Sequence, residues 1–483
     1  MARIQGRVLE TYPPLVVDLD GTLLRSDLLM ETAMAFIRSQ PLKVYKLLGW
    51  LFQGKAALKQ GLALETEIDV SVLPYDPQVI EMIKAEKANG RMIVLATASH
   101  VSLAEKIAEH LDLFDLVLAS NTNRNLSGDN KRDLLVAHYG EGGFDYLGNS
   151  KDDVPIWKVS RQAWLINPHS GVEQRIKAVR EIEPVVRSNT ASLRDWRKAL
   201  RLHQWLKNAL VFVPLLASHR ISQFELVRDG VLAFLFFGLC ASSVYILNDL
   251  LDLCDDRHHK SKCNRPFASG KLSIKAGLLL VPTLLAVSFG GALMLLPWQF
   301  SAVMAAYYCL TLGYSLSLKR MMAVDVIVLA MLYTARIIAG VAAFNLTLTF
   351  WILAFSMFMF LSLAMVKRYA ELRDARAREV NTMARGRGYY PGDLDMIASL
   401  GASSGYLAVM VLALYIQDAA TTALYGTPHI IWLACPLLLF WVTRVWMLTH
   451  RGMMNDDPVV FAIRDRSSQL IGAAFMMMFW IAA

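Results

Sequence analysis

The chain has 483 residues, of which 55% are hydrophobic and 19% are charged, and its formal net charge is +8 at pH 7. This composition is too apolar for an ordinary soluble enzyme, so we expect membrane-spanning segments. The positive charge does not indicate a nucleic-acid partner, because no RNA- or DNA-binding motif is present and lysine and arginine gather in short loops, as on a cytoplasmic membrane face. Residues 1–14 lack the apolar core of a signal peptide, so we expect the front half to stay in the cytoplasm.

The front half begins with a short β-like run, residues 15–17, that ends in two aspartates two positions apart, Asp18 and Asp20. Two carboxylates at the end of a strand can share a Mg²⁺ ion, one attacking a phosphorus atom while the other protonates the leaving oxygen. The segment DLDGT resembles the first motif of haloacid dehalogenase-type phosphohydrolases. The resemblance predicts Asp18 and Asp20 as catalytic residues and metal ligands.

Three later positions resemble the other motifs of that family in order. Thr97 follows a second β run and matches the phosphate-holding hydroxyl, and Lys131 matches the lysine that steadies the phosphate. The segment YLGNSKDD resembles the GDSxxD loop, which implies Asn149 and Asp153 as metal ligands. Asn149 replaces the usual aspartate, and its neutral oxygen binds Mg²⁺ more weakly. Two interpretations therefore stay open, an active phosphatase or phosphotransferase and a degenerate structural or ligand-sensing domain.

Alternating β runs and helical stretches predict a doubly wound α/β domain over residues 1–190, with its site at the carboxyl ends of the strands. In the family that the front half resembles, a helical insert at this place, here about 27–73, is a cap that selects the substrate. Its leucines, aromatic residues and lysines also suit a helix on an anionic bilayer, as well as a cap helix packed on the core. Residues 191–205 are expected to form a juxtamembrane connector.

An acidic motif follows a long apolar run in the second half. Its side chains, which step by one, three and four positions and so would share one helical face, are Asn248, Asp249, Asp252 and Asp256. Oxygen ligands of this kind suit Mg²⁺, which usually bridges to substrate phosphates. We expect a metal-diphosphate site here, with the three aspartates also catalytic. A solvated charged loop is the simpler alternative, and the spacing of Cys254, His258, His259 and Cys263 leaves a zinc site as another.

The pattern N-D-x-x-D-x-x-x-D, with a basic segment after it, resembles the first signature of the UbiA-type intramembrane prenyltransferase superfamily. The resemblance implies an all-α polytopic domain over residues 206–483. We expect about nine spans, the first one short, at roughly 208–219, 229–248, 274–296, 299–316, 323–344, 350–366, 396–416, 428–447 and 468–483. Loops rich in lysine and arginine alternate with loops that are nearly free of them, which predicts a bacterial inner (plasma) membrane protein with both sites on the cytoplasmic side.

Two further segments resemble one subgroup, the decaprenyl-phosphate phosphoribosyltransferases. They are R-x-x-Q-W-x-K-N at 201–208 and K-R-Y-A-E-L at 367–372, where prenyltransferases that use aromatic acceptors generally have a second aspartate-rich motif. The subgroup's substrates are a polyprenyl phosphate and phosphoribosyl diphosphate. The residues expected to contact phosphate or substrate are Lys207, Lys262, Arg265, Arg336, Lys367, Arg368, Tyr369 and Glu371. A late loop at 456–466 also resembles the subgroup, and its pattern predicts no role.

Together the halves predict a two-step membrane enzyme that transfers 5-phosphoribosyl to a polyprenyl phosphate and then removes the 5-phosphate. Tethering the two activities would give the second step a high effective substrate concentration. Three alternatives remain: a prenyltransferase with an aromatic acceptor, a front domain that regulates or acts on an unrelated phosphate, and a lipid-linked-sugar transporter or scaffold.

Overall fold

The computed structural model describes residues 12–121, 124–177, 185–187, 190–377, 388–418, 425–454 and 457–482. The chain forms two compact units. The first contains Met1–Leu200 and Ile246–Leu280, and the second contains Arg201–Tyr245 and Val281–Ala483. The acidic motif therefore belongs to the same unit as the front half of the chain.

A six-stranded sheet with the order β3-β2-β1-β4-β5-β6 forms the centre of the first unit, and every described strand pair in it is parallel. Its strands are β1 (Leu15–Val17), β2 (Ile93–His100), β3 (Leu116–Ser120), β4 (Asp145–Gly148), β5 (Ala163–Ile166) and β6 (Val185–Val186). Because β1 lies between β2 and β4, the chain reverses its winding direction there. The carboxyl end of β1 is thus the switch point at which doubly wound folds place their sites, and the predicted fold class is confirmed.

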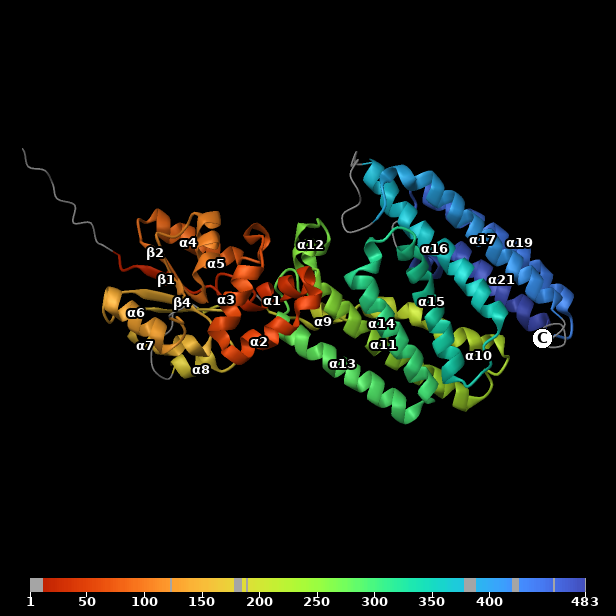
Figure 1. Cartoon of the computed structure of the whole chain (residues 1–483), viewed down its shortest axis with the longest axis horizontal. Helices are drawn as coiled ribbons and strands as arrows, with labels where there is room; N and C mark the ends of the chain where they lie inside the picture. The colour runs from red at the N-terminus through yellow and green to blue at the C-terminus, as the bar shows by residue number, and fades with distance from the viewer. Residues whose placement is uncertain are drawn as a thin grey trace, which may run out of the picture. The chain divides into compact units, whose positions relative to one another are not determined.

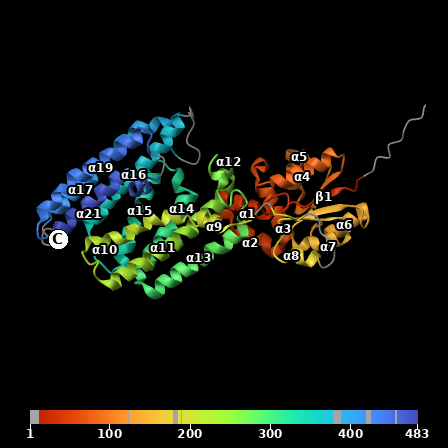
Figure 2. The ribbon, with the colours of Figure 1, turned by 180° about the vertical axis from the view of Figure 1, so that it is seen from behind.

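Helices cover both faces of this sheet, as Figure 1 and the reverse view in Figure 2 show. On one face are α4 (Pro77–Ala88) and α5 (Val101–Leu111), and on the other are α6 (Asp129–Tyr139), α7 (Val154–Val159) and α8 (Val172–Lys177). The alternation of β1 explains this, since Leu15 and Val17 pack into one core and Val16 into the other.

The insert between β1 and α4 is helical, as the sequence predicts. It contains α1 (Leu28–Ser39), η1 (Pro41–Lys43), α2 (Tyr45–Gln53), α3 (Lys55–Glu65) and η2 (Val70–Val72). Asp27 caps α1 by accepting hydrogen bonds from the backbone N–H groups of Leu29 and Met30. The ring of Phe36 packs 5.5 Å from that of Trp50, which fixes α1 against α2.

The rest of the described chain is mostly helical. Its longer elements are α9 (Leu193–Ala199), η4 (Leu202–Phe212), α10 (Val213–Ala217), α11 (Phe224–Leu251), α12 (Leu253–His258), α13 (Ile274–Leu295), α14 (Trp298–Leu316), α15 (Val324–Ala343), α16 (Phe350–Ala377), α17 (Leu394–Gln417), α19 (Ala434–His450), α20 (Pro458–Arg464) and α21 (Arg466–Ala482). Short 3₁₀ turns lie between them: η5 (Lys262–Asn264), η6 (Leu318–Arg320), η7 (Pro391–Asp393) and η8 (Pro428–Leu433).

Six of the described helices are long and apolar enough to cross a membrane, so the expected count of nine is not confirmed. The six candidate spans are Phe224–Leu251, Ile274–Leu295, Val324–Ala343, Phe350–Ala377, Pro391–Gln417 and His429–His450. The other three predicted spans also fall in helices. However, α14 contains Gln299 and three tyrosines that lower its hydropathy, α21 has 17 residues, and the first span is divided between η4 and the five-residue α10.

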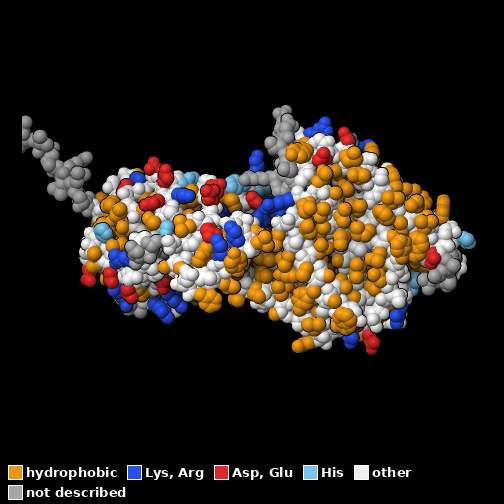
Figure 3. Space-filling view, viewed as in Figure 1, with side chains coloured by type: hydrophobic (Ala, Val, Ile, Leu, Met, Phe, Trp, Pro, Cys, Tyr) orange, Lys and Arg blue, Asp and Glu red, His pale blue; other side chains and the backbone are white. Residues whose placement is uncertain are grey.

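Large apolar side chains lie on the outside of the helical unit. Figure 3 shows them spread across the face of α13 to α17 that it draws. Met294 is 84% exposed, Phe350 72% and Phe440 57%, although a soluble protein rarely exposes so large an apolar area. This surface is that of a protein whose helices face lipid.

Candidate active sites

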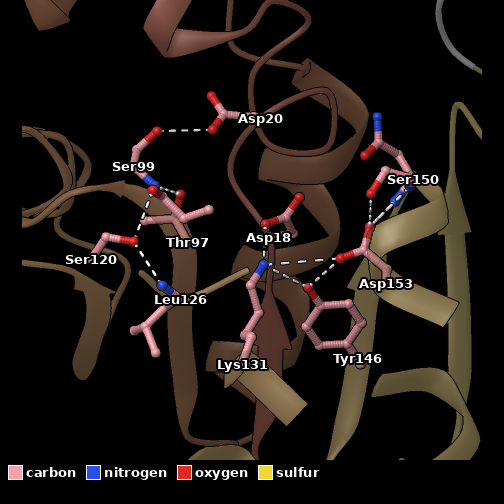
Figure 4. A network of polar contacts seen from close by, with 12 residues as sticks. Asp18, Asp20, Thr97, Ser99, Ser120, Leu126, Lys131, Tyr146, Ser150 and Asp153 are labelled. Atoms are coloured by element: carbon pink, nitrogen blue, oxygen red, sulfur yellow. Dashed lines mark hydrogen bonds and ion pairs between the residues drawn. The ribbon is translucent and has the colours of Figure 1, made fainter. Parts of the chain in front are cut away.

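The first site lies at the carboxyl end of β1 and contains a chain of charged contacts (Figure 4). The Lys131 ammonium group, on α6, lies 2.7 Å from Asp18 Oδ1 and donates to the Tyr146 hydroxyl at 3.0 Å. That hydroxyl in turn donates to Asp153 Oδ1 at 2.7 Å. All four side chains are buried, so the positive charge of Lys131 partly offsets the cost of burying the Asp18 carboxylate.

Asp20 accepts a hydrogen bond on each oxygen. The backbone N–H of Leu28 donates to Oδ1 at 2.7 Å, and the hydroxyl of Ser99 donates to Oδ2 at 2.8 Å. Burial raises the pKa of Asp18 to about 7 against the opposing charge of Lys131. Burial, together with the charge of Asp27, raises the pKa of Asp20 to about 6. Such a carboxyl group can hold a proton near neutral pH, which a general acid requires.

Thr97 also lies in this site, as the sequence predicts. It is fully buried on β2, and its hydroxyl oxygen accepts the backbone N–H of Ser99 at 3.0 Å. From the cap, Lys59 on α3 extends to the same strand end, where its ammonium group donates to the carbonyl of Ala98 at 2.6 Å. Partial burial lowers the pKa of Lys59, although Asp20 and Asp27 oppose the shift. The sequence analysis did not single out Ser99 or Lys59.

The loop after β4 holds the two remaining predicted metal ligands. Asp153 Oδ2 accepts the backbone N–H groups of Asn149 and Ser150 and the hydroxyl of Ser150, so this carboxylate fixes the loop. The Asn149 side chain packs against Gly21, where an added Cβ would lie 2.0 Å from the amide nitrogen. The carboxylates of Asp18 and Asp20 and the carboxamide of Asn149 thus lie at adjacent strand ends. This set of oxygen donors fits a hard cation such as Mg²⁺. The metal-binding role of Asp153 stays a prediction.

The acidic motif is divided between two helices rather than lying on one. Helix α11 ends at Leu251, and Asp252 is the N-cap of α12 with φ −95° and ψ 14°. Aspartate favours such positions because its short side chain competes with helical hydrogen bonds. The interruption is local, because the backbone N–H of Asp252 still donates to the carbonyl of Asn248 at 2.9 Å and that of Asp256 to the carbonyl of Asp252 at 2.8 Å.

Two of the three carboxylates nevertheless meet. The guanidinium Nη1 of Arg265 lies 3.1 Å from Asp249 Oδ1 and 2.6 Å from Asp256 Oδ2. Asn248 Oδ1 is buried and accepts no hydrogen bond, and an unsatisfied oxygen beside these carboxylates fits a role as a cation ligand. Asp252 is instead paired with Arg38. Among the residues that the structure describes, no three Asp, Glu, His or Cys side chains form a metal-binding group, and this includes the cysteines and histidines considered for zinc.

A cationic cluster in the second unit contains two of the predicted phosphate contacts. The ammonium groups of Lys207 and Lys367 lie 2.5 and 3.7 Å from Asp457 Oδ2. The hydroxyl of Tyr333 donates to the same carboxylate at 3.1 Å. The two lysines outweigh the effect of burial and lower the pKa of Asp457 to about 2. Asp457, in the late loop whose pattern predicted no role, thus joins η4 to α16. Its neighbour Asp456 lies outside the described residues.

Arg336 connects this cluster to an apolar cavity. Its guanidinium donates to Asn208 Oδ1 at 3.0 Å and to the Tyr307 hydroxyl at 3.1 Å, and it lies over the ring of Tyr333, as does Lys207. Tyr307 also lines a cavity of about 550 Å³ between α14, α15 and α16, whose other lining residues are mostly apolar. Phe350 on its rim is exposed, so the cavity opens at the outer surface of the unit.

The other residues predicted to contact phosphate or substrate lie outside the cationic cluster. Arg368 is 1% exposed and pairs with Asp325 at 2.8 Å and with Glu371, while the Tyr369 hydroxyl lies 2.8 Å from His450 Nδ1. Arg368 thus holds α16 against α15 and Tyr369 holds it against α19, whereas the pair of Arg368 with Glu371 lies within α16. Lys262 is exposed and close enough to lower the pKa of Asp256, although burial has the larger effect and raises it. The phosphate-binding roles of these residues stay predictions.

Comparisons with known proteins agree with the family resemblance of each half of the chain. The UbiA prenyltransferase family matches residues 210–481, and haloacid dehalogenase-like hydrolase matches residues 15–158. The uncharacterised protein y4nM of Sinorhizobium fredii is 36% identical over 97% of this chain and 91% of its own length. Nodulation protein NoeC of Azorhizobium caulinodans is 36% identical over 58% of this chain and 92% of its own. Decaprenyl-phosphate phosphoribosyltransferase of Mycobacterium tuberculosis is 30% identical over 59% of this chain and 91% of its own. The chain therefore belongs to the UbiA prenyltransferase family and carries a haloacid dehalogenase-like domain in front of the membrane domain.

Proposed function

We propose that the chain is a bifunctional membrane enzyme that transfers 5-phosphoribosyl from phosphoribosyl diphosphate to a polyprenyl phosphate and then removes the 5-phosphate. The similarity to decaprenyl-phosphate phosphoribosyltransferase along most of that enzyme's length supports the first step. The strand-end carboxylates beside Lys131 support the second step.

The observation that carries the transfer step is the continuity between the cationic cluster and the apolar cavity. Lys367 supplies a positive charge where an aromatic-acceptor enzyme generally has acidic residues, and Lys207 adds a second charge beside the same carboxylate. Such charges pair directly with phosphate oxygens. The cavity reached through Arg336 and Tyr307 suits the first isoprene units of a lipid whose phosphate is bound at the lysines.

In the transfer step, an oxygen of the polyprenyl phosphate attacks C1 of phosphoribosyl diphosphate. The bond from C1 to the diphosphate oxygen breaks, and the diphosphate leaves with the electron pair. Asn248, Asp249, Asp252 and Asp256 would hold Mg²⁺, which when bound neutralises charge on the departing diphosphate. Lys207, Lys367 and Arg336 bind and orient the lipid phosphate.

In the second step, Asp18 attacks the phosphorus of the 5-phosphate while Asp20 gives its proton to the leaving ribosyl oxygen. Asp20 then accepts a proton from the water that hydrolyses the phosphorylated Asp18. Lys131 and Thr97 hold the phosphate oxygens, and Mg²⁺ at Asp18, Asp20 and Asn149 would share their charge. Both steps would take place on the cytoplasmic face, because the lysine- and arginine-rich loops predict that side.

The test uses purified full-length protein with phosphoribosyl diphosphate labelled in its 5-phosphate, a polyprenyl phosphate and Mg²⁺. The wild type should form a ribosyl lipid and release labelled phosphate. Asp18→Asn should accumulate the labelled lipid without releasing phosphate, and Asp249→Asn should form neither product. Retained phosphate release from the lipid in Asp18→Asn would contradict the second step. Transfer only from a prenyl diphosphate to an aromatic acceptor would contradict the first.

A further inference from the structure

Helix α1 of the cap connects the two acidic sites within the first unit. At its N-terminus, the backbone N–H of Leu28 donates to Asp20 Oδ1 at 2.7 Å. Near its C-terminus, Arg38 pairs with Asp252 of the acidic motif. Ten residues separate Leu28 and Arg38, so these contacts lie about 15 Å apart along the helix axis.

Two charged pairs attach α1 to the segment that follows α11. Arg38 contacts Asp252, and its Nη2 donates to Asp255 Oδ2 at 3.0 Å. Two helical turns earlier, Glu31 accepts both Nη2 and Nη1 of Arg257, at 2.6 and 3.0 Å. Residues 31 and 38 are seven positions apart and so share one face of the helix. The attachment is therefore specific, because a basic residue of α1 faces two acidic residues of the partner segment and an acidic residue of α1 faces a basic one.

The Glu31 pair and the Arg38 pair differ in burial. The side chains of Glu31 and Arg257 are 5% and 6% exposed, whereas those of Arg38 and Asp252 are 19% and 22% exposed. Separating a buried, bidentate pair costs much more than separating a partly exposed one. The Glu31 pair is thus the fixed anchor, and it keeps Arg38 beside Asp252 when that carboxylate changes partner.

We propose that Arg38, a residue of the front domain, is a positioning residue of the membrane half that competes with a divalent cation for the Asp252 carboxylate. The inference rests on the proposed function, which makes Asp252 a cation ligand. Arg38 contacts Oδ1 of Asp252, so a cation that takes this oxygen as a ligand must displace Arg38. The front domain thereby sets the cation affinity of the acidic motif, which explains why these two halves share one chain.

The test is Mn²⁺ binding, followed by electron paramagnetic resonance on full-length protein in nanodiscs without substrate. All proteins carry Asp18→Asn and Asp20→Asn, so that Mn²⁺ reports the acidic motif alone. Arg38→Gln should bind Mn²⁺ about tenfold more tightly, as expected for loss of a charged hydrogen bond. Arg38→Lys should be intermediate, because a lysine keeps one charge but not the fork that contacts both aspartates.

The matched control is Lys46→Gln, another cap cation, whose ammonium group lies 2.7 Å from Glu65 and which should leave Mn²⁺ affinity unchanged. Equal or weaker Mn²⁺ binding by Arg38→Gln and Arg38→Lys, with thermal unfolding like that of the parent, would overturn the competition. Mn²⁺ binding that persists when Asp249→Asn is added would instead show that the acidic motif is not the cation site, which contradicts the proposed function.

Discussion

Asp145, at the start of β4, is an acid of the front domain that pairs with two arginines. It is fully buried, forms an ion pair with Arg91, and accepts Arg161 Nε and Nη2 at 2.9 and 2.6 Å. Burial alone would raise the pKa of Asp145, but the hydrogen bonds and charges of the two arginines outweigh it and hold the pKa below its usual value. The ion pairs of Asp145 with the two arginines fix β4, and with it the loop that carries Asn149.

Asp145→Asn should therefore destabilise the front domain by about 2 kcal/mol at pH 7, because the buried Arg91 would keep only the more exposed Glu86 as its counter-charge. The folded-state pKa of Asp145 is depressed, so its contribution is complete above the unfolded pKa of about 4 and is lost as pH falls through the folded value. Thermal unfolding of the full-length wild type and variant, followed by fluorescence, should differ at pH 7 and converge below pH 4. An equal difference at both pH values would contradict this account.

Replacing Asp457 tests whether the cationic cluster is needed for the transfer step. Asp457→Asn removes the carboxylate that holds Lys207 and Lys367 together, so we expect phosphoribosyl transfer to fall at least about tenfold. Phosphate release from a small soluble phosphate ester should stay unchanged, since that reaction needs only the front site. The matched control is Asp465→Asn in the same loop, which pairs with Arg444 at 2.7 Å and should keep transfer activity. Equal losses in the two variants would show that the loop matters only for folding.

At the scale of elements, the position of η4 depends on a close approach to α15. A Cβ added at Gly340 would lie 2.0 Å from the carbonyl oxygen of Val211, so the two backbones touch at this point. Since η4 carries Lys207 and α15 carries Arg336, this contact sets the relative position of the two cations.

Gly340→Ala should thus push η4 away from α15, at a cost of about 1–3 kcal/mol, and should lower transfer activity. Gly290→Ala in α13 is the control, because nothing lies within 4 Å of an added Cβ there. Replacing that helical glycine should leave activity intact and stabilise the helix by up to about 1 kcal/mol. Unfolding temperature and transfer rate are measured for both variants. Equal changes in Gly340→Ala and Gly290→Ala would contradict a specific role for the contact between η4 and α15.

Sequence patterns predict the ends of some secondary-structure elements and not of others. The strand ends that carry Asp18 and Thr97 could be predicted, because β periodicity and motif order are local features. The helix break at Asp252 could not be predicted, since the spacing of the acidic side chains fits one continuous helix equally well. Tertiary partners decide between the two possibilities, and here α1 supplies Arg38 and Glu31 to the segment after the break.

At the scale of the whole molecule, an α/β front and a membrane-spanning rear were evident from composition and hydropathy. The pairs that connect distant segments were not. Arg38 and Asp252 are 214 positions apart, and Lys207 and Asp457 are 250 apart, so no local pattern links them. Sequence spacing located the lysines and the acidic motif, but only the fold brings Asp457 to the lysines and the cap to the acidic motif.

The claim of a two-step reaction is tested by the mass of the lipid product. Purified protein is incubated with Mg²⁺, a polyprenyl phosphate and phosphoribosyl diphosphate, and the lipid product is identified by mass. A ribosyl-phosphoryl lipid without its 5-phosphate is the predicted result, because it requires both steps. No lipid product, together with prenyl transfer to an aromatic acceptor, would contradict the claim, and a product that keeps the 5-phosphate would contradict its second step.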